Sequence, residues 1–498
     1  MRRILIFSLL LAVFESSARS NVLFIAVDDL NDWVGYLDGY PGEEHTPNLD
    51  RLAAQGTAFV NAHTAVPVCC PSRVAVMSGR LPSTTGIYNN GQWWKPHLPD
   101  LKTLPVLFRA NGYVAVGAGK IFHHTAGNNP PSQWDQFERM VFTDNAFAYN
   151  QPGKPQNPSY PWTSPAELPV EFPYSGIHCY SREVDWGVLP KSEEEYDDAL
   201  VADYGVTFLG KPCDKPFFLA CGFFRPHMPW YAPQKYVDLY PEHSIQLPPA
   251  PASDLDDIPK VGRELALRKY DDLARIRAEG KWRRAVQMYL ASISFMDAQL
   301  GRVLDALEQG PHANETIIVL WSDHGWHLGE KQHWHKRTLW EEATRVPMIV
   351  VAPKVGKPGQ RCSEAVSVLD LYPTLVELCG LQNADGWDGE SLVSLLRDPK
   401  ARRVRPAVTI HEKRHVSVRD EEYRYIEYTN GEGELYTHAD DPNEWVNRAK
   451  DPELAPVIQR LKKWIPSEWA KSAPTKGAYL FDPKTYSWKH KKSGLVTQ

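Results

Sequence analysis

Four apolar segments of this 498-residue chain are each followed directly by charged or imidazole side chains. The segments are 21–27, 113–119, 216–224 and 315–321, and the residues that follow them are Asp28 and Asp29, then Lys120, His123 and His124, then Arg225 and His227, and finally Asp323 and His324. Carboxylates and an imidazole are suitable ligands for a divalent, oxygen-preferring cation such as calcium or magnesium. Lysines and histidines are suited to holding an anion. One site that binds a cation and an anion together would explain all four segments.

Each of these signals is weak by itself. A pair of aspartates after a strand more often caps a helix or forms a turn, and a single histidine there is usually a hydrogen-bonded structural residue. Lys336 lies in the sequence HWHK and could equally belong to a solvated face. The site is therefore predicted from the combination of the four segments.

The histidine-rich stretch HGWHLGEKQHWHK also permits a zinc site, with four histidines as ligands: His324, His327, His333 and His335. No cysteine joins them, and their spacing fits no helical zinc motif. We favour the simpler interpretation that most of them are loop residues around one ligand.

A pair of adjacent cysteines, Cys69 and Cys70, lies in the sequence VCCPSRVAVMSGR at 68–80. Adjacent cysteines do not easily bridge each other, because the peptide between them would be strained. The chain has seven cysteines, spread far apart, which does not resemble a small disulfide scaffold. One of the two adjacent cysteines is better explained by chemistry than by a disulfide.

The elements that must position these residues alternate between strands and helices. Short apolar runs typical of buried strands are separated by helical patterns, such as TPNLDRLAAQG at 46–56 and the long amphipathic segment 285–309. This alternation predicts an α/β fold with a large, mostly parallel sheet covered by helices on both faces. Ligands bind outside the carboxyl ends of the strands in such sheets, which is where the charged residues fall.

The chain divides into three predicted parts. Residues 1–20 run from two arginines through a short apolar core to small residues, which indicates a signal peptide. We predict a catalytic domain over 21–400 and a C-terminal subdomain over 401–498, the latter with a small antiparallel sheet and a terminal helix. Residues 128–175 and 232–280 are irregular, and long loops of this kind tend to carry binding functions.

The composition excludes some classes of protein. The net charge of −6 is modest and argues against a nucleic-acid partner. No segment after the first is apolar for long enough to span a membrane, so we expect an exported protein, periplasmic or extracellular, without stable membrane insertion.

The motif at 69–80 resembles the signature of the sulfatase family, C-x-P-S-R-x-x-x-[LM]-[TS]-G-R, with Cys69 in the first position and Cys70 in the free one. The segments GKIFH at 119–123, FRPHMP at 224–229 and SDHGWHLGE at 322–330 are similar to the iduronate-2-sulfatase branch of this family. The segment 434–447 is similar to the C-terminal domain of the family. The resemblance implies an alkaline-phosphatase-like sandwich and hydrolysis of a sulfate ester on a sulfated saccharide.

The resemblance also implies a cofactor and a role for each site residue. A dedicated maturation enzyme would convert Cys69 to formylglycine, whose hydrate is the nucleophile, and Cys70 would only fill space. The expected ligands of one divalent cation, usually calcium, are Asp28, Asp29, Asp323, His324 and the modified residue 69. Arg73 would bind the hydrate, Lys120 and Lys336 the sulfate oxygens, His123 would assist proton transfer, His227 would protonate the leaving oxygen, and Trp326 would contact the sugar at the rim of the pocket.

Two other functions remain open at this point. A phosphatase or phosphodiesterase of the same superfamily typically uses Ser or Thr with two metal ions, whereas this motif has Cys and ligands for one. A glycan-binding protein without turnover would result if Cys69 stayed unmodified. Within the sulfatase interpretation, both glycosaminoglycan and algal glycan substrates are open.

Overall fold

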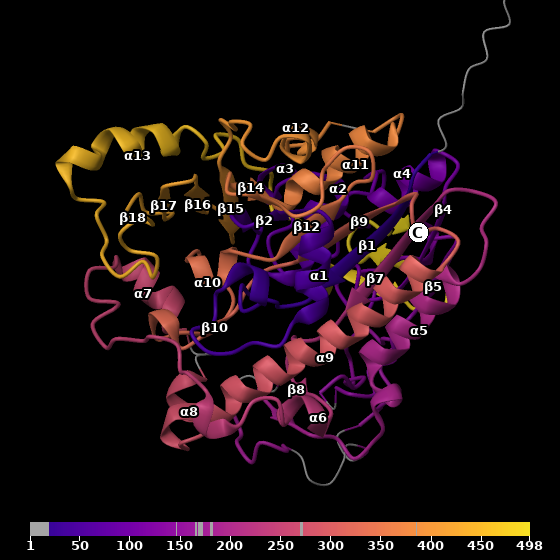
Figure 1. Cartoon of the computed structure of the whole chain (residues 1–498), viewed down its shortest axis with the longest axis horizontal. Coiled ribbons are helices and arrows are strands. Elements are labelled where there is room, and N and C mark those ends of the chain that lie inside the picture. Colours follow the sequence, from indigo (N-terminus) through magenta and orange to yellow (C-terminus); the bar gives the residue numbers. More distant parts are fainter. Residues whose placement is uncertain are drawn as a thin grey trace, which may run out of the picture.

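The computed structural model describes residues 19–145, 147–164, 167, 173–179, 183–268, 272–384 and 386–498. Nearly all of the predicted signal peptide lies outside these residues. The centre of the molecule is a sheet of eight strands, shown in Figure 1. In spatial order its strands are β13 (Gln360–Cys362), β2 (Thr57–Phe59), β12 (Met348–Val351), β9 (Thr316–Ser322), β1 (Asn21–Val27), β7 (Phe217–Phe223), β4 (Val114–Gly119) and β5 (Gln136–Glu138).

The sheet is mostly parallel, as predicted. Strands β9, β1, β7 and β4 are consecutive neighbours and all run in the same direction. Strand β12 pairs antiparallel with both β9 and β2. The four strands with charged residues after them therefore end side by side at one edge of the sheet, which brings those residues together.

Helices cover both faces of the sheet because the side chains of each strand alternate between two cores. In β1, Leu23, Ile25 and Val27 belong to a core shared with α1 (Pro47–Gln55), α5 (Asp197–Leu209) and the 28-residue α9 (Trp282–Gln309). The alternate residues of β1 face a second core with α2 (Cys69–Ser78), α4 (Leu104–Ala110) and α11 (Leu371–Cys379). A strand that is buried on both faces reads as a continuous apolar run, which is why these strands were visible in the sequence.

Shorter elements complete this part of the chain. They are α3 (Pro82–Thr85), α6 (Gln234–Val237), α7 (Lys260–Ala266), α8 (Leu273–Ala278), α10 (Glu341–Thr344), α12 (Val393–Arg397), and the strand pairs β3 (Ala62–His63) with β14 (Val366–Ser367), β6 (Trp186–Gly187) with β8 (Trp230–Tyr231), and β10 (His327–Leu328) with β11 (Trp334–His335). The described part of segment 232–280, which we predicted to be irregular, thus contains three short α-helices.

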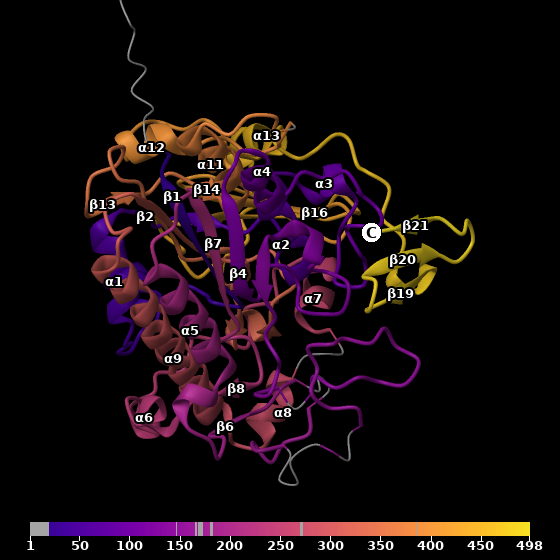
Figure 2. The same ribbon diagram turned by 90° about the vertical axis from the view of Figure 1, so that its right-hand side faces the viewer.

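The C-terminal region adds two antiparallel sheets. Strands β15 (Ala407–His411), β16 (His415–Arg419), β17 (Tyr423–Glu427) and β18 (Gly433–Thr437) form the predicted one. Helix α13 (Ala455–Lys462) follows, but it does not end the chain, because β19 (Tyr479–Asp482), β20 (Ser487–His490) and β21 (Val496–Thr497) form a second sheet beyond it. Figure 2 shows this second sheet at the edge of the molecule. No helix in the described parts of the chain is long and apolar enough to cross a membrane.

Two glycines allow the backbone to pass closely where β4 ends. Gly119 has a φ of +78°, and a Cβ on it would lie 2.1 Å from the carbonyl oxygen of Gly222 on β7. A Cβ on Gly222 would in turn lie 2.4 Å from the backbone of Lys120. The chain can therefore turn directly after β4, which places Lys120 at the carboxyl edge of the sheet.

Candidate active site

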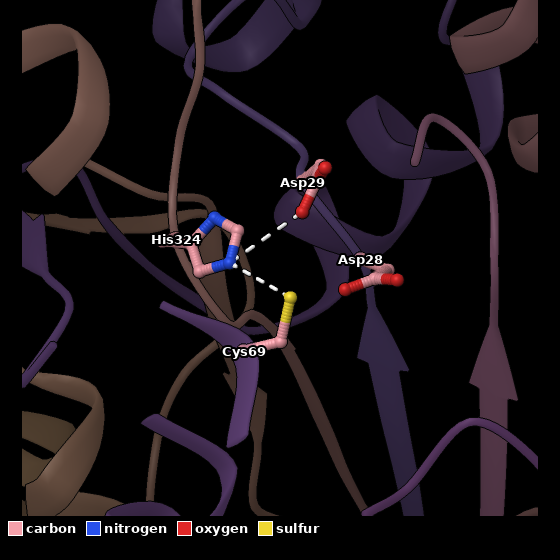
Figure 3. A group of neighbouring side chains, drawn as sticks. All are labelled: Asp28, Asp29, Cys69 and His324. Atoms are coloured by element: carbon pink, nitrogen blue, oxygen red, sulfur yellow. Dashed lines mark hydrogen bonds and ion pairs between the residues drawn. The ribbon is translucent and has the colours of Figure 1, made fainter. Parts of the chain in front are cut away.

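Four of the five predicted metal ligands meet at the carboxyl edge of β1, as Figure 3 shows. Asp28, Asp29, Cys69 and His324 each offer one ligand atom, and these four atoms lie within 4.8 Å of one another. All four residues are buried. Asp29 has a φ of 59°, a left-handed conformation that aspartate tolerates better than most residues, so the two successive carboxylates can both reach the site.

Asp323 lies beside this cluster but is engaged differently. Its Oδ1 accepts a hydrogen bond from the amide of Asp29 at 3.1 Å, and its Oδ2 accepts one from Arg73 Nε at 2.8 Å. Asp323 Oδ2 is 3.7 Å from Nε2 of His324. The fifth predicted ligand is therefore in place next to the other four.

Cys69 is the first residue of α2, and its thiol faces the predicted metal and sulfate residues. Its Sγ lies 3.4 Å from His324 Nε2 and 3.1 Å from Lys336 Nζ. Lys336 also donates to Asp29 Oδ1 at 2.7 Å. Cys70 points elsewhere, toward the backbone of Gln92 and the side chain of Asn128. The two adjacent cysteines therefore have different surroundings, and Cys69 is the one in the site.

Arg73 and Lys120 both bind the carboxylate of Asp28. The Arg73 guanidinium donates to Asp28 Oδ1 at 3.0 Å as well as to Asp323, and it also donates to the backbone carbonyl oxygens of Lys120 and, at 3.2 Å, Ile121. Lys120 forms an ion pair with the other oxygen of Asp28. Arg73 is completely buried, so these contacts replace all of its water.

His227, one of the two predicted histidines, approaches the carboxylate of Asp29. His227 Nε2 is 3.9 Å from Asp29 Oδ2, and His227 Nδ1 is 2.6 Å from the carbonyl oxygen of Met228. His123 stands next to His124, with 4.7 Å between their ring centroids. Both predicted residues, His123 and His227, are 5% exposed, so solvent reaches them only slightly.

Trp326 does not lie at a rim. It is 2% exposed and packs against Trp230, with Lys336 Nζ 5.4 Å from its ring centroid. The family resemblance predicted a place at the rim of the pocket. The ring of Trp326 is instead buried in the core, because it packs among other apolar side chains. Its contact with the site goes through Lys336.

The buried charges shift one another's pKa values. Burial raises the pKa of Asp29 to about 8, although Lys336 opposes this shift. Burial would raise the pKa of Asp28 too, but attraction from Lys120 and Arg73 outweighs it and lowers that pKa well below its usual range. Burial lowers the pKa of His227, and Lys120 and Lys336 lower it further. Burial also raises the pKa of the Cys69 thiol. At neutral pH and without a cation, these shifts favour a neutral His227, a thiol at Cys69 and a protonated Asp29.

The four-histidine zinc site is not formed. His327 bonds to Thr338 Oγ1 at 2.7 Å, and His333 bonds to the carbonyl oxygens of Ala266 and Lys336. His335 pairs with Asp272 at 3.0 Å. These three histidines have separate hydrogen-bond partners, and only His324 belongs to the cluster, which agrees with the simpler interpretation.

The structure adds supporting residues that the sequence did not indicate. Tyr289 on α9 donates to the carbonyl oxygen of Asp29 at 2.8 Å, and Ser72 donates to that of Asp323 at 2.6 Å. Asp198 accepts from the amides of Phe224 and Arg225, which fixes the turn that carries His227. These contacts link residues far apart in sequence, so no local pattern could reveal them.

This buried cluster of carboxylates, imidazole and thiol beside two lysines offers groups suited to a divalent cation and to an anion. The family model described as Sulfatase matches residues 20–381, and a second one, N-sulphoglucosamine sulphohydrolase, C-terminal, matches residues 329–471. The chain belongs to the sulfatase family and is a sulfuric ester hydrolase.

Relatives agree with this assignment. A sulfatase of Formosa agariphila is 39% identical over 94% of this chain and 91% of its own length. Iduronate 2-sulfatase of Homo sapiens is 32% identical over 73% of this chain and 69% of its own length. Among solved structures, a protein in complex with D-glucosamine-2-N,6-O-disulfate is similar in fold, with a TM-score of 0.68, 22% identity, and coverage of 90% of this chain and 97% of the other.

Proposed function

We propose that this protein is exported and hydrolyses a sulfate ester on a sulfated saccharide, in the manner of an iduronate-2-sulfatase-like enzyme. The observation that carries the proposal is the position of Cys69, whose Sγ lies between His324 and Lys336 at the cluster of buried carboxylates. The 32% identity to human iduronate 2-sulfatase and the 26% identity to an ulvan-active sulfatase of Formosa agariphila support a saccharide substrate, with glycosaminoglycan and algal glycan both within its scope.

The nucleophile in this proposal is the hydrate of formylglycine, made from Cys69 by a maturation enzyme. A hydrate has two hydroxyls, so one can take the sulfuryl group while the second later expels sulfate. The surroundings of residue 69 fit such a group, since the Lys336 ammonium and the His324 imidazole already lie within hydrogen-bonding reach of its Sγ.

The donor atoms fit one divalent cation, most suitably calcium. Oδ2 of Asp29 is buried without a hydrogen-bond partner in the described part of the chain, which is costly for a carboxylate oxygen unless a cation occupies the site. Asp28, Asp29, Asp323 and His324, with the modified residue 69, would hold the cation. When bound, it would polarise the sulfuryl oxygens and stabilise the charge that develops on them.

The remaining residues have roles that follow from their positions. Lys120 and Lys336 supply positive charge for the sulfate oxygens. Arg73 was expected to bind the hydrate, but its guanidinium bonds Asp28, Asp323 and backbone carbonyl oxygens, so we assign it the role of holding the carboxylates in place. The surroundings of His227 lower its pKa and keep it neutral, so it must first take up a proton to act as an acid toward the leaving oxygen. The pKa of His123 is lowered too, and this residue would exchange protons near Lys120. Trp326 would orient Lys336 by lying against it.

The experiment that tests the proposal starts with mass spectrometry of the tryptic peptide 52–73 from protein exported by a host able to mature sulfatases. We expect Cys69 to have lost its sulfur and gained an aldehyde. The same preparation is then assayed on a panel of sulfated saccharides and on matched phosphate esters. An unmodified cysteine would favour the glycan-binding alternative, and faster cleavage of the phosphate esters would favour the phosphatase.

Replacing His227 should slow the reaction in a way that depends on the leaving group. In His227→Ala we expect kcat/KM for a sulfated saccharide to fall by roughly 10²- to 10⁴-fold, because the sugar alkoxide needs a proton as it leaves. The loss for 4-nitrophenyl sulfate should be much smaller, because nitrophenolate leaves without protonation. His243→Ala, which removes an exposed histidine, is the control. Equal losses for both substrates would exclude the acid role.

Removal of the cation should abolish activity and destabilise the fold. After dialysis against a chelator we expect turnover of 4-nitrophenyl sulfate to be lost and the thermal midpoint to fall. Calcium should restore both, since a cation at about 100 times its Kd contributes about 2.7 kcal/mol to stability. A titration with calcium, magnesium and zinc, followed by scanning calorimetry, measures the preference. An unchanged thermal midpoint and unchanged turnover would contradict the metal site.

A further inference from the structure

A small pocket adjoins the candidate active site on the side of His123. It has a volume of about 40 Å³ and is lined by three separate segments of the catalytic region and by Tyr486 near the C-terminus. The lining residues that matter here are His123, His124, Arg139, Ser159 and Tyr486. A space of this size holds about three water molecules.

The pocket carries positive charge that no acid balances. Arg139 forms no ion pair with a carboxylate in the described part of the chain, and none of the residues that line the pocket is acidic. Its guanidinium lies 5.1 Å from the ring centroid of Tyr486, a contact that holds it over an aromatic face. A second cation, Lys476, donates to Oγ1 of Thr125, another lining residue, at 2.8 Å. An arginine held in place without a carboxylate partner is a good receptor for an anion.

The pocket lies close to where the leaving oxygen should be. The ring centroid of His124 is 5.8 Å from that of His227 and 4.7 Å from that of His123. The Nδ1 atoms of His123 and His124 are buried and have no hydrogen-bond partner among the described residues. His124, which lines the pocket, is therefore a direct ring neighbour of the predicted acid, His227.

One wall of the pocket comes from the C-terminal sheet. Tyr486 lies between β19 and β20, which Figure 2 shows beyond α3 at the edge of the molecule. Its hydroxyl accepts a hydrogen bond from the amide of Asn129 at 3.1 Å, which ties the sheet to the loop after His123. This sheet thus contributes to the surroundings of the substrate although it is remote in sequence.

We propose that this pocket, through Arg139, binds a second anionic group of the saccharide, either a carboxylate or a further sulfate, while the scissile sulfate lies at Cys69. The proposal rests on the proposed function, since it assumes that the leaving oxygen meets His227. It defines the substrate class as saccharides with at least two negative charges close together.

The test compares substrates that differ only in the second charge. Arg139→Ala and wild-type enzyme are assayed on a sulfated disaccharide that contains a uronic acid, on its methyl ester, on a disulfated saccharide, and on 4-nitrophenyl sulfate. We expect Arg139→Ala to lower kcat/KM about 10- to 100-fold for a substrate with the second charge, mainly through KM, because a hydrogen bond to a charged group is lost. The methyl ester and 4-nitrophenyl sulfate should be affected little.

Two further variants test whether the loss comes from the charge of Arg139 and from its position. Arg139→Lys, which keeps the charge, should recover part of the affinity. Lys211→Ala removes an exposed positive charge between the end of α5 at Leu209 and the start of β7 at Phe217, at the opposite edge of the sheet, and should change nothing. A loss confined to the uronate identifies a carboxylate, and a loss confined to the disulfated saccharide identifies a sulfate. Equal losses on all four substrates, or none, would overturn the proposal.

A measurement of binding affinity tests the role of the pocket even if no sulfate ester is cleaved. Isothermal titration of the uronate disaccharide and its methyl ester into Cys69→Ala protein measures affinity without turnover. If the wild-type protein is inactive, the proposed function fails, but a weaker affinity of Cys69→Ala/Arg139→Ala for the uronate alone would still support the pocket. The disulfated saccharide is titrated in the same way, and affinities for it and for the uronate that are the same with and without Arg139 would exclude the pocket.

Discussion

Cys69→Ser is expected to fold normally and to lose turnover by roughly 10⁴-fold or more, measured as release of inorganic sulfate. Serine has nearly the same volume as cysteine, and residue 69 lies at the start of α2, where serine is tolerated. A serine hydroxyl could accept the sulfuryl group but would have no second hydroxyl to expel it. The variant should therefore accumulate a stable sulfate ester on residue 69, which mass spectrometry of peptide 52–73 would detect.

The matched control is Cys70→Ser, because the two cysteines are adjacent in sequence but differ in surroundings. Cys70 lies 3.9 Å from the carbonyl oxygen of Gln92, away from the cluster. We expect Cys70→Ser to keep most of its activity, apart from a modest loss of stability from placing a hydroxyl in a buried position. Full activity in Cys69→Ser, or equal loss in both variants, would contradict the role of residue 69.

Arg73→Met should be the most destabilising single substitution in the site. It would leave Asp28 and Asp323 buried without the guanidinium that bridges them at 3.0 and 2.8 Å. Removing one partner of a buried ion pair typically costs 3 to 5 kcal/mol, so we expect the free energy of unfolding to fall by about that amount. Urea unfolding followed by tryptophan fluorescence, in the presence of a chelator, measures the change.

Arg73→Lys separates charge from geometry. The guanidinium of Arg73 donates hydrogen bonds to two carboxylates and two carbonyl oxygens. A lysine retains the positive charge but can reach only some of these four groups. We expect an intermediate loss of stability. Excess calcium should restore part of the stability of both variants, because a cation would take over some of the lost charge. An Arg73→Met protein as stable as the wild type would show that the carboxylates are protonated or solvated instead.

The central sheet was predictable because burial on both faces leaves a clear trace in the sequence. The strands that became β1, β4, β7 and β9 are continuous apolar runs, and the segment that became α9 has a regular apolar stripe. Their parallel order puts the residues after them at one edge, so the cluster of Asp28, Asp29 and His324 followed from fold class and position.

Other features depend on contacts between distant segments and left no such trace. The direction of β12 is set by its neighbours β9 and β2, and an apolar run has no direction of its own. The sheet of β19, β20 and β21 was missed because its strands are short and half exposed. Trp326 was misplaced because its burial depends on Trp230, which follows a different strand. The pocket around Arg139 needs Tyr486, almost 350 residues further on.

The burial of α2 affects when residue 69 can be modified relative to folding. Each of the ten residues of this helix is buried, and Cys69 is 1% exposed. The proposed conversion of Cys69 by a maturation enzyme needs access to this residue, and the folded helix does not give it. We therefore expect the proposed conversion to compete with folding, so that a variant that folds faster would keep a larger fraction of its molecules with an unmodified thiol.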